Sequence, residues 1–312
     1  MLDVREAHGG MIAIKLSHGK LAQRAASPYP PRVTELDRQF RAVLRPLGRT
    51  ITRYRMIADG DRILVAVSGG KDSSALLYVL RHLQARAPVR FALAAVTVDG
   101  GWGGHPIAKL QRFCEALDVP LEVRQADIVS AVVERVPEDD TPCPLCARMR
   151  RGTLYRAARE GGFRTVALGH HADDLVETLL LNQIFNGQLK AMPPVLRSDD
   201  GVTTVIRPML MIEEATIRAF AHGAGLPSVP CQCLGAGNNT LRRPQIKELV
   251  TDLEERFPGA RRNLAGASGR LHPRHLTDER WLPLDEEPAA SPSGKRPPPP
   301  PAPGELAEQL AG

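Results

Sequence analysis

No hydrophobic run in this chain approaches the roughly 20 residues that a membrane-spanning helix requires. The apolar stretch nearest the N-terminus, residues 11–14, is too short for the core of a secretory signal, and no small-residue cleavage site comes after it. Internal repeats are also absent. These absences predict a cytoplasmic protein with no membrane partner.

Aromatic residues and cysteines are scarce. Aromatic side chains make up 4% of the chain, so we do not expect extensive stacking on nucleic-acid bases. The five cysteines are not expected to form structural disulfides, because the cytosol keeps thiols reduced, and any that cluster point to metal or redox chemistry. The 41 basic residues outnumber the 35 acidic ones, and the net charge of +6 favours a polyanionic partner.

The two ends of the chain differ in composition from its centre. Residues 1–33 mix Gly, Ser, Pro and scattered charges, and residues 279–312 include five consecutive prolines. Neither segment has enough apolar surface to offset the entropy lost on ordering, so the first is predicted to be flexible and the second to be a disordered tail. A single domain is expected over residues 34–278.

Hydrophobic stretches alternate with helical patterns through this central region. Such alternation predicts an α/β fold with a doubly wound, mostly parallel sheet and helices on both faces. Ligands of such sheets bind at the carboxyl ends of the strands, so residues 68–74, Asp99 and residues 169–174 should converge on one crevice. Strands are predicted at residues 63–67, 91–98, 121–124, 165–168 and 203–207, and helices at residues 36–47, 73–83, 107–117, 147–159, 173–185, 213–222 and 244–257.

The stretch from Ile63 to Ser74 has the pattern strand, two-glycine turn, helix. Glycines let backbone N–H groups turn inward, and a helix that begins at this point directs its positive end toward the same place. A lysine adds a mobile positive charge, and serine hydroxyls can donate to phosphate oxygens. The predicted anion-binding residues are Ser68, Gly69, Gly70, Lys71, Asp72, Ser73 and Ser74.

The order of these residues excludes the mononucleotide-binding loop of kinases and GTPases, because Asp72 stands where that loop has Ser or Thr. The run Ser-Gly-Gly-Lys-Asp-Ser at residues 68–73 resembles instead the pyrophosphate loop of the N-type ATP pyrophosphatases. Those enzymes attack the α-phosphate of ATP and release pyrophosphate. An ordinary glycine-rich turn is the alternative interpretation.

Two further strand ends carry carboxylates. Asp99 ends the second predicted strand, where it either meets a nucleotide or its metal, or serves as a solvated turn residue. The run Gly-His-His-Ala-Asp-Asp at residues 169–174 ends another strand and opens a helix. Asp173 or Asp174 can cap that helix and still face the crevice. Two histidines and two carboxylates together exceed what a cap requires.

Cys143 and Cys146 are separated by two residues and precede a predicted helix, whose dipole favours thiolates. Cys231 and Cys233 lie in a loop rich in proline and glycine and can add one or two thiolates. Three thiolates suit an iron–sulfur cluster with one open iron, whereas four suit zinc. A thioredoxin-like redox pair is a further alternative. Cys114 is predicted to be a buried thiol on a helix.

Arginines populate the helix after the cysteine pair and the C-terminal part of the domain. They form either solvated helix faces or a surface that neutralises RNA phosphates. They are Arg148, Arg150, Arg151, Arg156 and Arg159, with Arg242, Arg243, Arg261, Arg262, Arg270 and Arg274 later in the chain.

Further motifs are Cys-Pro-Leu-Cys-Ala-Arg-Met-Arg-Arg-Gly-Thr-Leu-Tyr at residues 143–155, Leu-Gly-His-His-Ala-Asp-Asp at 168–174, Met-Pro-Pro-Val-Leu at 192–196, Ser-Asp-Asp-Gly at 198–201 and Ile-Arg-Pro at 206–208. Together these segments resemble the tRNA 2-thiocytidine synthetase family, the tRNA-cytidine(32) 2-sulfurtransferases. With the pyrophosphate loop, the likeness extends over residues 40–276. The chain departs from the family where Pro-Cys-Gln-Cys at residues 230–233 shortens a Pro-Cys-x-x-Cys pattern, and in the glycine-rich segment after Asp99.

The resemblance implies an enzyme that uses ATP and Mg²⁺, carries a [4Fe-4S] cluster and acts on the anticodon loop of tRNA. It implies that O2 of cytidine 32 is adenylated with release of pyrophosphate, and that sulfur then replaces it with release of AMP. A sulfur donor such as a cysteine desulfurase is expected as a partner, and the oligomeric state is open, a homodimer included. Carried over by position, the cluster ligands are Cys143, Cys146 and Cys231, the nucleotide-binding residues are those of the loop with Asp99, Gly169 and His170, and the catalytic residues are Lys71, Asp72, Asp173 and Asp174.

Three other functions fit part of the pattern. A PP-loop ligase that adenylates tRNA and then adds an amine has no need of the three cysteines. A PP-loop thiolase of the two-zinc-finger type, acting on another base, has flanking cysteine pairs that this chain lacks. A zinc-bound RNA-binding protein leaves the Ser-Gly-Gly-Lys-Asp-Ser run without a role.

Overall fold

The computed structural model describes residues 33–101, 103, 106–137, 141–229 and 242–282. The terminal segments expected to be flexible or disordered lie almost entirely outside these ranges, and Cys231 and Cys233 lie wholly outside them. The domain boundaries therefore stay a prediction.

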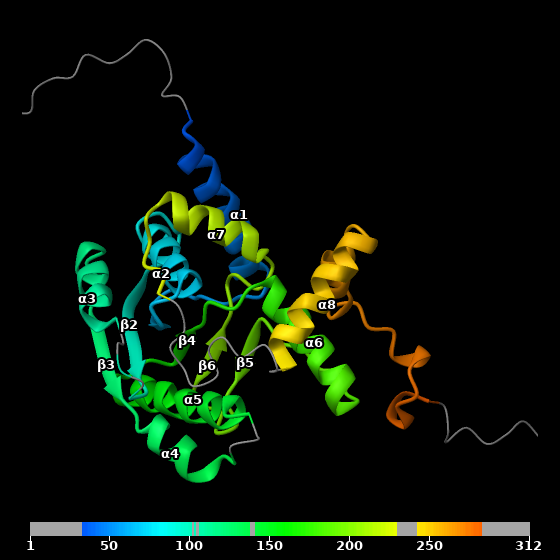
Figure 1. Ribbon diagram of the computed structural model, residues 1–312. Coiled ribbons are helices and arrows are strands. Elements are labelled where there is room, and N and C mark those ends of the chain that lie inside the picture. Colours follow the sequence, from blue (N-terminus) through cyan, green and yellow to red (C-terminus); the bar gives the residue numbers. More distant parts are fainter. Residues whose placement is uncertain (1–32, 102, 104–105, 138–140, 230–241, 283–312) are drawn as a thin grey trace, which may run out of the picture.

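A six-stranded sheet forms the centre of the fold, in the order β3-β2-β1-β4-β6-β5 (Figure 1). All neighbouring strands are parallel except β5 and β6, which pair antiparallel. The predicted doubly wound, mostly parallel α/β sheet is confirmed, and the antiparallel edge strand is an addition to it. The strands are β1 (Asp61–Ala66), β2 (Phe91–Asp99), β3 (Leu121–Gln125), β4 (Thr165–Ala167), β5 (Val195–Arg197) and β6 (Thr204–Ile206).

Most helices lie close to their predicted positions, and α4, α9 and β5 are additions that the sequence pattern does not predict. The helices are α1 (Glu35–Arg53), α2 (Lys71–Gln84), α3 (Ile107–Ala116), α4 (Ile128–Arg135), α5 (Cys143–Glu160), α6 (Ala172–Asn186), α7 (Glu214–Gly223), α8 (Arg242–Arg256) and α9 (Ala260–Ala267), with the 3-10 turns η1 (Pro273–His275) and η2 (Glu279–Trp281) after them. None of the described helices is long and apolar enough to cross a membrane.

Two predicted helix boundaries were wrong. Helix α1 continues beyond its predicted end at Leu47 to Arg53, because the additional turn buries Thr50, whose hydroxyl donates to the Pro46 carbonyl at 2.9 Å. Helix α5 begins at Cys143 rather than after the cysteine pair. Proline is tolerated in a first helical turn, where its missing N–H has no intrahelical partner anyway, so Pro144 does not delay the helix.

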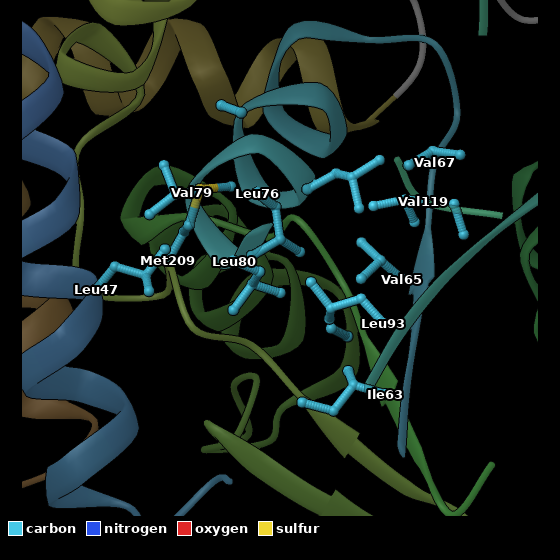
Figure 2. Close-up of a cluster of buried hydrophobic side chains, with 14 of the residues drawn as sticks. Leu47, Ile63, Val65, Val67, Leu76, Val79, Leu80, Leu93, Val119 and Met209 are labelled. Atoms are coloured by element: carbon cyan, nitrogen blue, oxygen red, sulfur yellow. The ribbon is translucent and has the colours of Figure 1, made fainter. Parts of the chain in front are cut away.

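Side chains of β1 alternate between two hydrophobic cores, as the pleat of a strand requires. Ile63 and Val65, with Val67 just after the strand, pack with α1, α2, α3 and α7 on one face of the sheet (Figure 2). Leu64 packs with α5 on the other face. Burial on both faces explains the continuous apolar run in the sequence, which is typical of a central parallel strand.

The strand order reverses at β1. From β1 the chain builds β2 and then β3 on one side, and it returns to place β4 on the other side of β1. At such a reversal the connections of a doubly wound sheet leave to opposite faces, so a ligand site is expected at the carboxyl ends of β1 and β4. Helix α6, which comes after β4, is covered by α8 and α9. Val176 and Leu180 of α6 pack with Ile246 and Val250 of α8, and Leu264 of α9 packs against this cluster.

Candidate active site

The loop between β1 and α2 exposes the N-terminus of α2. Its N-cap residue is Gly70, and no side chain of the described residues caps the helix there. The first-turn N–H groups of α2 are therefore available to an anion. Gly69 has φ +85°, and a Cβ at this position would lie 2.7 Å from Cγ of Pro106, so only glycine fits the turn.

The serines of this loop hold its shape. The backbone N–H of Ser68 donates to Oγ of Ser73 at 3.1 Å, and the hydroxyls of Ser73 and Ser74 both donate to the Gly70 carbonyl at 3.0 Å. Ser73 and Ser74 are buried, whereas Ser68 is exposed. Ser68 is thus the loop hydroxyl most accessible to a ligand.

Lys71 and Asp72 occupy the first turn of α2. Nζ of Lys71 lies 3.0 Å from Oδ2 of Asp72 and 2.8 Å from Oε1 of Glu214. Burial disfavours the charged lysine, but its hydrogen bonds to Glu214 and Asp72 outweigh that effect and hold the pKa of Lys71 above its usual value. The other oxygen of Asp72, Oδ1, is buried and has no hydrogen-bond partner among the described residues.

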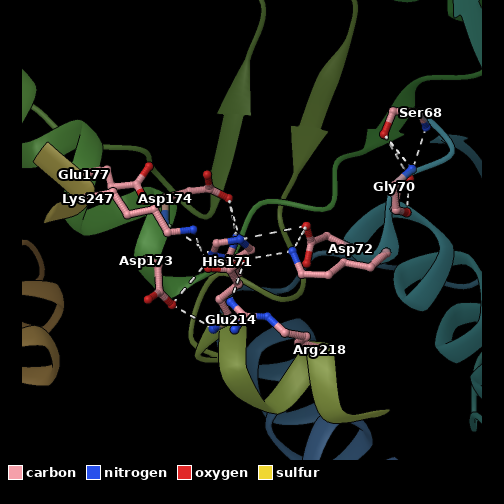
Figure 3. Close-up of polar contacts among 12 residues, drawn as sticks. Ser68, Gly70, Asp72, His171, Asp173, Asp174, Glu177, Glu214, Arg218 and Lys247 are labelled. Atoms are coloured by element: carbon pink, nitrogen blue, oxygen red, sulfur yellow. Dashed lines mark hydrogen bonds and ion pairs between the residues drawn. The ribbon is translucent and has the colours of Figure 1, made fainter. Parts of the chain in front are cut away.

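The turn between β4 and α6 lies beside the loop between β1 and α2, because β4 is the neighbour of β1 in the sheet. His171 is the N-cap of α6, where its Nδ1 accepts from the backbone N–H of Asp174 while its own backbone N–H donates to Oδ2 of Asp174. Gly169 approaches α2 so closely that a Cβ there would lie 3.0 Å from the backbone N of Ser73. The two predicted segments, residues 68–74 and 169–174, are thus brought together (Figure 3).

Asp173 and Asp174 do more than cap α6. Oδ2 of Asp173 accepts from the backbone N–H of Glu214 at 2.7 Å, and Oδ1 of Asp173 lies 2.5 Å from Nη1 of Arg261. Oδ1 of Asp174 lies 3.2 Å from Arg243. Both carboxylates therefore connect α6 to helices later in the chain.

The sequence does not predict all of the charged residues that pair near the phosphate loop, and it predicts a different role for some of them. Glu214 and Lys247 do not stand out in the sequence, because no short motif marks them. Arg243 and Arg261 are candidates for RNA phosphates by their charge, but they pair with carboxylates beside the crevice. Nη1 of Arg243 also lies 2.7 Å from Oε2 of Glu177. Burial raises the pKa of the Glu177 carboxyl above its ordinary value, although the positive charge of Arg243 acts in the opposite direction.

His170 lies beside Arg207. Nε of Arg207 donates to Nδ1 of His170 at 3.3 Å, and Nη1 of Arg207 donates to the Pro193 carbonyl at 2.8 Å. Burial and the nearby arginines lower the pKa of His170 to about 4, although Asp174 opposes this shift. His170 is therefore a neutral hydrogen-bond acceptor near neutral pH.

Asp99 ends β2, next to β1 in the sheet. Its Oδ1 accepts from the backbone N–H of Gly101 at 3.0 Å, so the carboxylate closes the turn after the strand. The side chain is half-buried at the same sheet edge as the phosphate loop.

The cysteines occupy two environments. Cys143 is exposed and Cys146 is buried, and both belong to the first turn of α5. Nη2 of Arg150 lies 3.6 Å from Sγ of Cys146 and can donate to it. Cys114 is buried in α3 as predicted, and burial raises the pKa of its thiol to about 11. Within the described parts of the chain, no three His, Cys, Asp or Glu side chains are grouped as a metal site.

The amino-acid sequence of this chain is similar to that of several known proteins. Residues 34–229 match the PP-loop domain family. The chain is 50% identical over 238 residues to a tRNA-cytidine(32) 2-sulfurtransferase of Sorangium cellulosum, covering 76% of this chain and 84% of the relative. It is 47% identical over 246 residues to an enzyme of the same name from Anaeromyxobacter sp., covering 79% of this chain and 80% of the relative.

A solved structure has a similar fold. The U34-tRNA thiolase NcsA from Methanococcus maripaludis, determined with its [4Fe-4S] cluster, superposes with a TM-score of 0.61 at 22% identity. The match covers 75% of this chain and 79% of the thiolase. At this identity the likeness concerns the fold.

Proposed function

Because this chain belongs to the tRNA-cytidine(32) 2-sulfurtransferase family and carries a PP-loop domain, we propose that it replaces O2 of a tRNA cytidine with sulfur at the expense of ATP. The transferase class follows from the family, and the choice of cytidine at position 32 is the finer part of the proposal. The observation that supports it most strongly is the meeting of Lys71, Asp72 and the β4–α6 turn at the strand-order reversal.

ATP is the substrate that the loop fits. The uncapped N-terminus of α2, the tight turn at Gly69 and the charge of Lys71 provide backbone donors and a cation for the β- and γ-phosphates. Asp99, Gly169 and His170 line neighbouring strand ends and would contact the rest of the nucleotide. Gly169 suits this position because a side chain there would displace the backbone of α2.

Mg²⁺ fits the carboxylates of the crevice. Oδ1 of Asp72 is buried and has no hydrogen-bond partner among the described residues. Buried polar atoms normally have a partner, so a bound ligand would satisfy this oxygen. Magnesium is usually held by one or two carboxylates together with substrate phosphates, so Asp72 with Asp174 would suffice alongside ATP. The ion would neutralise charge on the phosphates.

Cytidine O2 is a poor leaving group, so it must be activated before sulfur can replace it. Cytidine O2 attacks the α-phosphate of ATP, and pyrophosphate departs. Lys71 and the N–H groups of α2 stabilise the negative charge that develops on the phosphates. The adenylated oxygen then leaves as AMP when sulfur attacks C2. The base must be turned out of its loop to reach the crevice.

The cysteines at the start of α5 fit an iron–sulfur cluster. Cys143 is accessible, Cys146 is near an arginine, and thiolates are favoured at a helix N-terminus. Cys231, outside the described residues, is the third proposed ligand. The cluster would supply the sulfur atom that is transferred. A brown protein after anaerobic purification supports this assignment, whereas a colourless protein with bound zinc contradicts it.

Charge supports tRNA as the macromolecular substrate. Arg148, Arg151 and Arg156 are exposed on α5, the helix that begins with the cysteine pair. They would neutralise backbone phosphates while the anticodon loop enters the crevice. A cysteine desulfurase is the class of partner expected to replenish sulfur, and the cytoplasm is the expected compartment.

The proposal is tested by mass spectrometry of tRNA nucleosides from a strain that lacks this protein. We expect 2-thiocytidine to disappear and to return when the full chain is expressed from a plasmid. Persistence of 2-thiocytidine at the wild-type level would overturn the proposal. Loss of a thiolated uridine instead would identify the enzyme as a thiolase for another base.

A further inference from the structure

Glu214 begins α7, and its side chain lies against three cations. Oε1 is 2.8 Å from Nζ of Lys71 and 3.1 Å from Nη2 of Arg218, and Oε2 is 2.9 Å from Nζ of Lys247. The side chain is 11% exposed, so these ion pairs are partly shielded from water. The cations come from α2, α7 and α8, and one carboxylate therefore joins three helices (Figure 3).

The main chain already holds Glu214 in place. Its backbone N–H donates to the carboxylate of Asp173 at 2.7 Å, and Asp173 is paired with Arg261. The first turn of α7 is therefore attached to α6 and α9 without the glutamate side chain. An anchoring role for the helix alone does not require the contact to the phosphate loop.

The cations around Glu214 also exceed what the carboxylate requires. Arg218 and Lys247 provide a partner for each of its oxygens, and Lys71 is an additional partner. Lys71, in contrast, depends on its acceptors. Its ammonium group sits on a flexible four-carbon stem, which samples many positions unless contacts such as those to Asp72 and Glu214 fix it.

The charges of this cluster still favour an anion. Arg218 and Lys247 are both paired with Glu214, so their positive charges offset the negative charge that Glu214 brings close to Lys71. Glu214 can therefore orient Lys71 without making the loop repel phosphates. Oε1 of Glu214 and Oδ2 of Asp72 hold Nζ from two elements.

We propose that Glu214 is a positioning residue, which holds Nζ of Lys71 at the first turn of α2 so that its charge meets the phosphates of ATP during adenylation. The inference rests on the proposed function, because it assumes that residues 68–74 bind ATP. Glu214 acts through Lys71 and does not itself contact the substrate.

The first test measures Lys71 directly, without turnover. The full-length protein is treated with a limiting amount of acetic anhydride, and acetylation is followed by mass spectrometry. In Glu214→Gln, acetylation of Lys71 is expected to rise relative to that of exposed Lys109 in the same molecule. Glu213→Gln is the matched control, because Glu213 is the exposed neighbour of Glu214. Unchanged acetylation of Lys71 in Glu214→Gln would overturn the proposal.

The second test separates binding from chemistry. In Glu214→Gln we expect kcat for tRNA-dependent pyrophosphate release to fall roughly 10- to 100-fold, because small misplacements of a catalytic group have effects of this size. The Kd of ATP, measured by calorimetry, should change less than about threefold, since the loop still binds phosphates. Rates are expressed per ATP-binding site, so that a fraction of unfolded protein does not lower kcat. A kcat equal to that of Glu213→Gln would contradict the proposal.

A double-mutant cycle distinguishes failure of this inference from failure of the proposed function. If Glu214 acts through Lys71, adding Glu214→Gln to Lys71→Ala lowers the residual rate no further. Independent, additive losses would overturn the positioning role while leaving the ATP site intact. Unchanged pyrophosphate release in Lys71→Ala alone would overturn the assignment of residues 68–74 as the ATP site, the part of the proposed function on which this inference rests.

Discussion

Nε2 of His171 lies 4.0 Å from Oδ2 of Asp72, and the two residues belong to the segments that follow the carboxyl ends of β4 and β1 (Figure 3). His171 caps α6 and Asp72 stands in the first turn of α2, so the contact joins two helices that come directly after neighbouring strands. This proximity arises from the strand order, because β1 and β4 are adjacent although 98 residues of sequence lie between Ala66 and Thr165. It brings the proposed phosphate loop and the proposed catalytic carboxylates into one site.

Lys71→Ala is expected to lower tRNA-dependent pyrophosphate release at least about 100-fold, because it removes a cation from the charge that develops on the phosphates. Release is measured with the full chain, ATP, Mg²⁺ and tRNA. Lys109→Ala removes an exposed lysine of α3 and should leave the rate unchanged. Wild-type release in Lys71→Ala would show that residues 68–74 are not the phosphate site.

Gly169→Ala is expected to weaken ATP binding, since the new methyl group would lie 3.0 Å from the backbone N of Ser73 and must displace the start of α2. The measurement is the Kd of ATP by calorimetry. Gly152→Ala is the matched control, because nothing lies within 4 Å of a Cβ at Gly152 in α5. That control should bind ATP normally and gain up to about 1 kcal/mol of helix stability. Equal ATP affinity in the two variants would contradict the close approach.

Cys143→Ser is expected to abolish iron binding, because serine does not replace a thiolate ligand of a cluster well. Cys143 is exposed, so the apoproteins of wild type and variant should have nearly equal thermal unfolding temperatures. Iron and sulfide are assayed after anaerobic purification, together with visible absorption. Cys114→Ala, in the buried core of α3, should keep its iron. Iron retained in Cys143→Ser would exclude Cys143 as a ligand.

The lowered pKa of His170 leads us to expect that the folded protein loses stability in acid. Burial first, and positive neighbours second, lower its pKa to about 4 from an ordinary 6.5, so the unfolded chain gains a proton that the folded protein does not bind. The free energy of unfolding should therefore fall as the pH drops from about 6.5 to about 4, by up to about 2 kcal/mol for a half-buried group.

The variant His170→Asn lacks this titration and should lose less stability than wild type over that range, as measured by denaturant unfolding at several pH values. His222→Asn, which removes an exposed histidine of α7, should retain the acid sensitivity of wild type. Equal pH dependence in wild type and His170→Asn would refute the assignment of the effect to His170.

Local sequence patterns were enough to predict much of the fold. The apolar run before Gly69 predicted a strand, and the two glycines with Lys71 predicted an anion site at a helix start. Each of these signals depends on neighbours in sequence, namely the period of apolar residues and the backbone freedom of glycine. Edge strand β5 was missed because three exposed residues carry no clear period.

What the sequence by itself determined was the class of sheet, the phosphate loop, the buried state of Cys114 and the resemblance to a family of tRNA sulfurtransferases. What only the tertiary structure decided was which charges meet. Lys71 pairs with Glu214 and Asp173 with Arg261, although each pair is far apart in the chain. Ion pairs of this kind follow from strand order and helix packing, which no local spacing of charges encodes.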